Sequence, residues 1–319
     1  MTPAALKQLE NDLWAAADNL RANSDLKSSE YSTPVLGLIF LKFADNKYRQ
    51  HEQAILAEYS KLKGTRREKP LSEIAVEKCG FYLPDQARYD YLLKLPEEKD
   101  IAKAIKQAMK LIEDNKPELE GVLPKDAYAS LTRTDKTIPK QLLKSFADIP
   151  QDASGDVFGQ IYEYFLGEFA KSEGQRGGEF FTPRSVVRLM VEIIEPHHGK
   201  VYDPACGSGG MFVQCAKFVE RHAGSATREL SVYGQEQKEV TVPLAKMNLA
   251  LHGLSGDIRL GNSYYDDLHG AVEKFDFVMA NPPFNVNGVD KDKLAGDKRF
   301  PFGLPRTDNG NYLWIQQFY

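Results

Sequence analysis

The chain has 319 residues, of which 42% are hydrophobic and 27% are charged, and its formal net charge is −4. This length suggests about two domains with a buried core, and the composition excludes collagen-like and wholly disordered chains. The acidic balance also excludes the chain-wide basic surface of a protein that binds nucleic acid unaided, so any such contact has to be local or shared with a partner.

The sequence gives no sign of a membrane anchor, an export signal or a metal site. Its longest apolar stretch, residues 35–41, is far shorter than a spanning helix, and the first residues include acids where a secretion signal has an apolar core. The three cysteines form no C-x-x-C pair, and no cysteine lies near His197 and His198. We therefore expect a cytoplasmic protein with no membrane partner and no bound metal.

The first 150 residues have the apolar spacing of amphipathic helices. One helix is predicted near the start, where apolar residues recur at Leu6, Leu9, Leu13 and Trp14. A second is predicted to begin after Thr33 with Pro34 at its first position, and a third to span residues 101–112. A basic run at residues 61–69 favours an exposed loop over a phosphate-binding patch. We expect a helical N-terminal domain over residues 1–150 that contacts DNA or a partner.

From residue 151 to residue 319 the predicted helices and strands alternate. Their order is helix 157–169, a helix from 183, strand 200–203, a helix after 210, strand 230–234, helix 242–251, strand 258–260 and strand 275–280. Such alternation predicts an α/β fold with a doubly wound parallel sheet. The boundary between the two domains is expected near residue 150.

A glycine-rich turn follows the first predicted strand. The sequence V-Y-D-P-A-C-G-S-G-G, residues 201–210, runs from an apolar strand through an acid into three glycines. Ligands bind at such turns in open parallel sheets, and Asp203 can accept a hydrogen bond from an ammonium group. Phe212 stands where a dinucleotide fingerprint has its third glycine, which disfavours NAD. The alternative is an ordinary strand-to-helix turn.

Polar residues end the next two predicted strands. Glu236, 26 residues after Gly210, is placed to accept hydrogen bonds from both hydroxyls of a ribose. Asn262 follows the third strand, where its amide would meet the edge of an adenine ring. A capping glutamate and a turn asparagine are the alternatives. Because both residues come after the glycine turn, they favour a nucleoside ligand.

The fourth predicted strand leads into N-P-P-F, residues 281–284, which suits one chemical problem. An exocyclic amino group is a poor nucleophile because its lone pair is delocalised into the ring. The side-chain oxygen of Asn281 and the carbonyl of Pro282 can each accept one amino hydrogen, and Pro283 fixes the turn without a donor of its own. Phe284 offers a flat face on which a base can stack. We expect these four residues to be catalytic.

In this order the motifs resemble those of amino-group methyltransferases that use S-adenosylmethionine (SAM). The whole chain resembles the modification (methyltransferase) subunit of type I restriction-modification systems. The resemblance begins with L-W-A-A-A-D-N-L-R at residues 13–21 and E-Y-S-T-P-V-L-G-L-I-F-L-K at residues 30–42. It continues with D-V-F-G-Q-I-Y-E-Y-F-L at residues 156–166 and G-G-E-F-F-T-P-R at residues 177–184. It implies a Rossmann-like, SAM-dependent methyltransferase domain over residues 151–319.

The resemblance also implies an activity, which is transfer of a methyl group from SAM to the N6 amino group of adenine in DNA, on a base turned out of the duplex. The implied partners are DNA, a specificity subunit that reads the sequence and, in the full complex, a restriction subunit. The implied lid over the cofactor consists of Glu179, Phe180, Phe181, Thr182, Pro183 and Arg184. The other implied cofactor-binding residues are Asp203, Ala205, Gly207, Ser208, Gly209, Gly210, Glu236 and Asn262.

The chain departs from the family pattern in two places. Asn262 stands where related enzymes often have an acid, and the chain stops at Tyr319 although the resemblance implies further strands. We therefore expect a sheet that is incomplete at its C-terminal flank and a truncated chain. Two alternatives remain. A protein-glutamine or RNA methyltransferase shares the motifs, and the truncation favours a non-catalytic scaffold that docks the specificity subunit.

Overall fold

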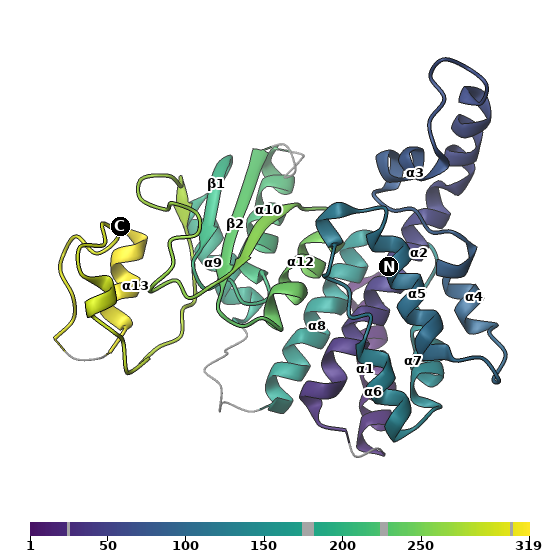
Figure 1. Cartoon of the computed structure of the whole chain (residues 1–319), viewed down its shortest axis with the longest axis horizontal. Coiled ribbons are helices and arrows are strands. Elements are labelled where there is room, and N and C mark those ends of the chain that lie inside the picture. Colours follow the sequence, from purple (N-terminus) through teal and green to yellow (C-terminus); the bar gives the residue numbers. More distant parts are fainter. Residues whose placement is uncertain (24–25, 174–181, 224–228, 307–308) are drawn as a thin grey trace. The chain divides into compact units, whose positions relative to one another are not determined.

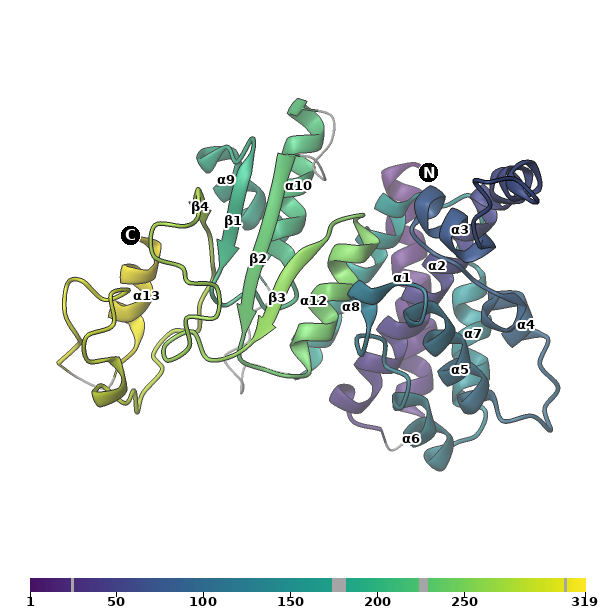
Figure 2. The same ribbon diagram turned by 45° about the horizontal axis from the view of Figure 1, so that its top comes forward.

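The structure is a computed structural model that describes residues 1–23, 26–173, 182–223, 229–306 and 309–319. The chain separates into two compact units, Met1–Glu173 and Gly174–Tyr319. Figures 1 and 2 show that the first unit is helical and that the second contains a parallel sheet. Among the described residues, no helix is both long enough and apolar enough to cross a membrane.

The first unit is a bundle of helices linked by short turns. Its helices are α1 (Pro3–Ala22), α2 (Ser28–Leu62), α3 (Leu71–Cys79), α4 (Tyr89–Leu93), α5 (Ile101–Glu113), α6 (Ala127–Thr134), α7 (Ile138–Ala147) and α8 (Gly155–Glu173). Helices α1 and α5 confirm the two predictions made from apolar spacing.

The predicted start of the second helix was wrong. Helix α2 begins at Ser28, so Pro34 lies inside the helix rather than at its first position. The earlier start is stabilised by Glu30, whose carboxylate accepts the backbone N–H of Lys27 at 3.0 Å. It is also anchored by the buried Tyr31, whose hydroxyl donates to the carbonyl of Ala17 at 2.8 Å. These contacts offset the backbone hydrogen bond that a proline inside a helix removes.

The packing of α8 places it in the helical unit, beyond the boundary expected near residue 150. The rings of Phe43 and Phe158 are 5.5 Å apart, and Trp14 on α1 meets Phe165 at 5.3 Å. The side chain of Asn46 donates to the carbonyl of Pro150 at 2.8 Å and holds the turn before α8 against α2. The compact unit therefore ends at Glu173, because the apolar face of α8 is buried against α1 and α2.

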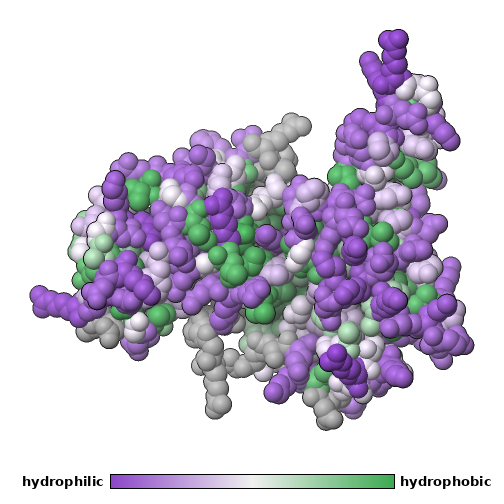
Figure 3. Space-filling model, viewed as in Figure 1, coloured by the Kyte–Doolittle hydropathy of each residue, from purple (hydrophilic) through white to green (hydrophobic). Residues whose placement is uncertain are grey.

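The basic run lies where α2 ends and in the turn that follows it. Lys61, Lys63, Arg66 and Arg67 are exposed, and this end of the unit is mostly hydrophilic in Figure 3. The turn is ordered by Gly64, which has a φ of 75° and donates its N–H to Glu68 at 2.9 Å. The run is therefore an exposed loop, as its composition favoured.

The second unit is built around four parallel strands. Its described elements are α9 (Arg184–Ile194), β1 (Gly199–Asp203), α10 (Gly210–Ala223), β2 (Leu230–Glu236), α12 (Thr241–Leu251), β3 (Gly256–Leu260), β4 (Phe277–Val278) and α13 (Asn311–Phe318). The order in the sheet is β3-β2-β1-β4. A helical region followed by a Rossmann-like parallel sheet is confirmed.

The fourth strand is shorter than predicted. Only Phe277 and Val278 pair with β1, opposite Val201 and Tyr202. One further bond, from the N–H of Met279 to the carbonyl of Tyr202 at 3.0 Å, continues the ladder past the strand. Ala280 and Asn281 follow without further pairing, and the two prolines after them have no N–H with which to resume it.

The two faces of the sheet are covered differently. On one face the strand residues Val201, Val232 and Ile258 belong to a single core with the inner sides of α9, α10 and α12. On the other face Tyr202 stacks on Phe275, with ring centroids 4.6 Å apart. The described helices α9, α10 and α12 therefore share one face, and double winding stays a prediction.

Candidate functional site

The site lies at the carboxyl edge of the sheet, where the strand order changes direction. Strand β2 pairs with one side of β1 and β4 with the other, and all the pairings are parallel. The chain segments that leave β1 and β4 therefore lie side by side at this edge. Ligands of open α/β sheets bind at this position.

The glycine turn after β1 has a backbone that few residues other than glycine adopt. Gly207 and Gly209 have φ values of 50° and 79°, in the left-handed region. The turn is closed by the N–H of Gly209, which donates to the carbonyl of Cys206 at 2.8 Å. A Cβ added at Gly207 or Gly210 would meet no atom of the described residues within 4 Å, so no described side chain fills the space beside these two glycines. The turn thus has room for a ligand directly against its backbone.

Asp203 ends β1 beneath this turn and is almost completely buried, with 1% of its surface exposed. One carboxylate oxygen accepts the backbone N–H of Ala205 at 2.9 Å. Burial, reinforced by the charge of Glu236, raises the pKa of Asp203 to about 8, although the bond from Ala205 opposes the rise. A cationic group bound here would favour the ionised carboxylate, so the residue is suited to an ammonium ion.

Glu236 at the end of β2 is joined to the glycine turn. Its Oε2 accepts the N–H of Gly207 at 3.0 Å, and its Oε1 accepts the N–H of Lys238 at 2.8 Å. Each carboxylate oxygen can accept a further hydrogen bond. The carboxylate is therefore fixed in position and still able to receive the hydroxyls of a ribose.

Asn262 forms a local turn after β3. Its side-chain oxygen accepts the N–H of Tyr264 at 3.0 Å, and its own N–H donates to the carboxylate of Asp266 at 3.1 Å. These local bonds show that Asn262 is a turn residue. Its contact with adenine stays a prediction. The turn adjoins the rest of the site, because the N–H of Gly261 donates to the carbonyl of Glu236 at 2.9 Å.

Asn281 follows β4 and has its side chain oriented by a distant residue. Its Nδ2 donates to the hydroxyl oxygen of Thr182 at 2.9 Å. No described residue donates to its Oδ1 or to the carbonyl of Pro282. Phe284 is 62% exposed, which leaves its ring available for stacking. Among the described residues, the N-P-P-F turn thus has two acceptors without donors and an exposed ring, and their catalytic role stays a prediction.

The predicted lid is described only in part. Glu179, Phe180 and Phe181 lie outside the described residues. Thr182 holds Asn281, and Pro183 caps α9, which begins at Arg184. The structure thus joins one end of this segment to the N-P-P-F turn.

Sequence reasoning missed several residues that support the site. Asn248 on α12 is fully buried and donates its Nδ2 to the carbonyl of Ser208 at 2.9 Å. Its sequence signal is a lone amide in an otherwise apolar stretch of helix, L-A-K-M-N-L-A-L. Asn311 and Trp314 on α13 contact the N-P-P-F turn, and no local pattern indicates this.

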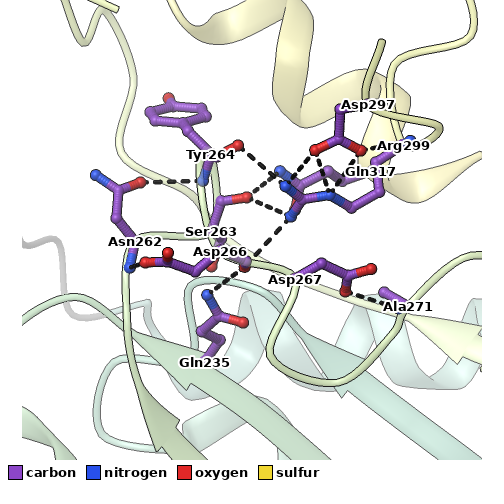
Figure 4. Close-up of polar contacts among 10 residues, drawn as sticks. All are labelled: Gln235, Asn262, Ser263, Tyr264, Asp266, Asp267, Ala271, Asp297, Arg299 and Gln317. Atoms are coloured by element: carbon purple, nitrogen blue, oxygen red, sulfur yellow. Dashed lines mark hydrogen bonds and ion pairs between the residues drawn. The ribbon is translucent and has the colours of Figure 1, made fainter. Parts of the chain in front are cut away.

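A buried arginine, also missed, organises the segment after β3 (Figure 4). Arg299 is only 7% exposed and donates to the carbonyls of Ser263 at 2.8 Å and Tyr264 at 3.1 Å. Its charge is paired with Asp297, at 2.6 Å. A buried guanidinium with these partners holds the loop that carries Asn262 in a fixed shape.

The order of the strands, with the glycine turn and the asparagine on opposite sides of the switch point, is that of a Rossmann-like methyltransferase domain. A family model described as N-6 DNA Methylase matches residues 153–319. The chain belongs to this family. A model described as the HsdM N-terminal domain matches residues 9–148.

Similar proteins include two curated methylase subunits of type I restriction enzymes. The MjaIX subunit of Methanocaldococcus jannaschii is 36% identical over 98% of this chain and 58% of its own length. The HindI subunit of Haemophilus influenzae is 36% identical over 77% of this chain and 55% of its own length. The chain thus spans somewhat more than half the length of these relatives.

The solved structure of a type I restriction-modification methyltransferase subunit from Streptococcus thermophilus has the same fold. It superposes with a TM-score of 0.80, at 22% identity, over 98% of this chain and 71% of that one.

Proposed function

We propose that this chain is the modification subunit of a type I restriction-modification system and transfers a methyl group from SAM to the N6 amino group of adenine in DNA. The observation that carries the proposal is the bond between Asn281 and Thr182, which leaves the amide oxygen of Asn281 available to accept a hydrogen bond. An acceptor fixed in this way next to the carbonyl of Pro282 suits an amino group with two hydrogens to donate.

The residues that follow β1 and β2, across the switch point from the N-P-P-F turn, would hold SAM. The space that the described residues leave beside Gly207 and Gly210 would accommodate the body of the cofactor, and Asp203 would receive its ammonium group. Glu236 would accept its ribose hydroxyls, while Ala205, Ser208, Gly209 and Asn262 complete the proposed pocket. The bound cofactor would supply a methyl group on a positively charged sulfur, which leaves as a neutral thioether.

The N-P-P-F turn deals with the weak nucleophilicity of the amino group. Asn281 Oδ1 and the carbonyl of Pro282 each accept one N6 hydrogen, which draws the nitrogen toward tetrahedral geometry and frees its lone pair. The buried Pro282 and the half-buried Pro283 keep the turn rigid. Phe284 stacks on the base, which in single-strand binders contributes about 1–3 kcal/mol. This contribution helps to offset the few kcal/mol needed to turn the adenine out of the duplex.

The net charge of the chain and the names of its relatives support the proposed partner subunits. With a net charge of −4, the chain does not read DNA unaided, so we assign sequence reading to a specificity subunit. The curated relatives are methylase subunits of type I restriction enzymes, which supports a restriction subunit in the full complex. The reaction on chromosomal DNA also supports a cytoplasmic location.

The test is Asn281→Ala in the protein purified from its host with the subunits that accompany it. We expect methylation of adenine to fall on the order of 10³-fold, because one of two acceptors at the reacting nitrogen is lost. SAM affinity should stay within about twofold of that of the wild type. The matched control is Asn115→Ala on the helical unit, where the side chain donates only to Leu111 at 2.9 Å.

Mass spectrometry of digested DNA, RNA and protein identifies the methylated product. N6-methyladenine in DNA supports the proposal, whereas methylated RNA or methylated glutamine favours the corresponding alternative. Wild-type protein that binds its specificity subunit without methylating anything supports the scaffold alternative. Full activity of Asn281→Ala would remove the role assigned to this residue.

A further inference from the structure

Residues 283–286, at the end of the N-P-P-F turn and just after it, make three hydrogen bonds with the start of α13 and the residue before it. Trp314 Nε1 donates to the carbonyl of Pro283 at 3.2 Å. The N–H of Asn285 donates to Asn311 Oδ1 at 2.7 Å. The N–H of Gly310 donates to the carbonyl of Val286 at 2.8 Å. We call these three bonds the α13 clamp.

The clamp acts on the residue that reverses the chain after Phe284. Asn285 has a φ of 57°, a left-handed conformation that asparagine tolerates better than most residues. Its side-chain oxygen also accepts Asn311 Nδ2 at 3.2 Å, so the two asparagines make reciprocal hydrogen bonds. This pairing fixes the direction in which the chain leaves Phe284, and with it the direction of the exposed ring.

Helix α13 is itself held firmly. Trp314 is 5% exposed and packs on Tyr264 with ring centroids 4.6 Å apart. Gly310 lies so close to Tyr264 that an added Cβ would collide with the hydroxyl of that tyrosine. At the other end of the helix Gln317 donates to the carbonyl of Ser263 at 2.9 Å, next to Arg299 (Figure 4). A rigid element therefore links the loop after β3 to the N-P-P-F turn.

We propose that Asn311 and Trp314 are positioning residues for methyl transfer, acting through the N-P-P-F turn. Thr182 orients the side chain of Asn281 from one side, and the α13 clamp fixes the backbone from the other. This inference rests on the proposed function, since it assigns the clamp to the same amino acceptor site. Displacement of reacting groups by about 1 Å can cost up to ~10²-fold in rate.

The first experiment measures the clamp without any activity. Hydrogen exchange is followed by mass spectrometry on peptides that cover residues 281–290, in which the two prolines contribute no amide. We expect Asn311→Ala to accelerate exchange there by ~10-fold or more, because the N–H of Asn285 loses its acceptor. Peptides from β1 and β2 serve as internal controls and should not change. Unchanged exchange in residues 281–290 would overturn the clamp.

The second experiment separates positioning from folding and cofactor binding, in the protein with its accompanying subunits. Trp314→Phe keeps an aromatic ring against Tyr264 and removes the N–H donor together with part of the indole volume. We expect kcat to fall ~10-fold while SAM affinity stays within about twofold. Asn311→Asp keeps the acceptor for the N–H of Asn285 but loses the donor to its side chain, so kcat should fall less than in Asn311→Ala. Trp14→Phe, in the helical unit, is the matched control and should leave kcat unchanged.

The outcomes distinguish this inference from the proposed function. Unchanged kcat in Trp314→Phe, or a loss of SAM affinity equal to the loss of kcat, would overturn the positioning role. Wild-type protein that fails to methylate adenine contradicts the proposed function and removes the catalytic role of Asn311 and Trp314 along with it. The exchange experiment still decides in that case whether the α13 clamp exists.

Discussion

The two sides of the site differ in how far along the chain their supports lie. On the cofactor side, the carboxylate of Asp203 accepts the N–H of Ala205, and that of Glu236 accepts the N–H of Lys238. Each donor is two positions from its acceptor. On the acceptor side, Asn281 is held by Thr182, which is 99 positions away, and Pro283 by Trp314, which is 31 positions away. The cofactor side also has longer links, from Gly207 to Glu236, 29 positions apart, and from Asn248 to Ser208, 40 positions apart. It is therefore supported partly by its immediate neighbours, whereas both of these contacts of the acceptor side come from distant segments.

The difference implies that substitutions on the two sides should affect different measurements. A change on the cofactor side should appear as altered SAM affinity. A change among the distant supports of the acceptor side should appear as a lower rate at unchanged affinity.

The largest expected effect is the pH dependence of SAM affinity. The free protein keeps Asp203 protonated below its pKa of about 8, and the ammonium of the cofactor would favour the ionised form. Binding then releases a proton, so affinity should rise up to ~10-fold per pH unit between pH 6 and pH 8 and level off above. Calorimetry in buffers of different ionisation enthalpy should detect release of about one proton at pH 7.

The matched variant is Asp203→Asn, which keeps the acceptor for Ala205 and removes the charge. Its SAM affinity should be ~10- to 100-fold weaker at pH 8 and should lose the pH dependence of the wild type. The free energy of unfolding depends on pH in the opposite direction to SAM affinity. The native chain retains a proton that the unfolded chain releases near pH 4, so this residue lowers the free energy of unfolding as pH rises toward 8. Equal, pH-independent affinities in both proteins would contradict the role of Asp203.

The distance along the chain between a site residue and its supports also explains which residues the sequence could predict. The glycine turn, Asp203 and Glu236 act within or next to their own strand ends, so residue type and spacing were enough to locate them. N-P-P-F was also found, because its chemistry is local. Asn311, Trp314 and Arg299 escaped because an asparagine, a tryptophan or an arginine gives no sign of the distant backbone atom that it will contact.

The misplaced start of the second helix has the same cause, and the domain boundary near residue 150 stays a prediction. Pro34 looked like a helix start, but the turn before it is held by Tyr31 against α1, a contact that spacing along the chain does not reveal. Helix α8 was recognised as a helix, yet its assignment to a unit depended on packing against Phe43 and Trp14. Local signals predicted the elements, and long-range packing decided their limits and neighbours.

A smaller effect is expected from Thr182→Val, which removes the hydroxyl that holds Asn281 but keeps the shape of the side chain. We expect kcat to fall ~10-fold, because the amide can rotate away from its productive orientation. SAM affinity should change less than about threefold, and Thr182→Ser should retain most of the rate. Steady-state methylation and calorimetry measure the two quantities. If affinity falls more than the rate, Thr182 serves mainly as the cofactor contact that the family resemblance implies.

The smallest effect is expected from Asn248→Ala, and it is the sharpest test of the contrast between the two sides. Asn248 is a long-range support on the cofactor side, 40 positions from the Ser208 carbonyl that it holds. The turn keeps its other bonds without it, from Gly207 to Glu236 and from Gly209 to Cys206. Among the described residues Asn248 Oδ1 has no hydrogen-bond partner, so the alanine also removes a buried, unsatisfied acceptor.

These opposing terms should leave the free energy of unfolding lower by about 1–2 kcal/mol. SAM affinity should change less than about threefold, because the glycine turn and the carboxylates stay in place. Denaturant unfolding and calorimetry give both values from one preparation. A loss of affinity above ~10-fold would mean that the cofactor side depends on a distant helix as much as the acceptor side does. The two sides would then differ in the number of their long-range supports and not in kind.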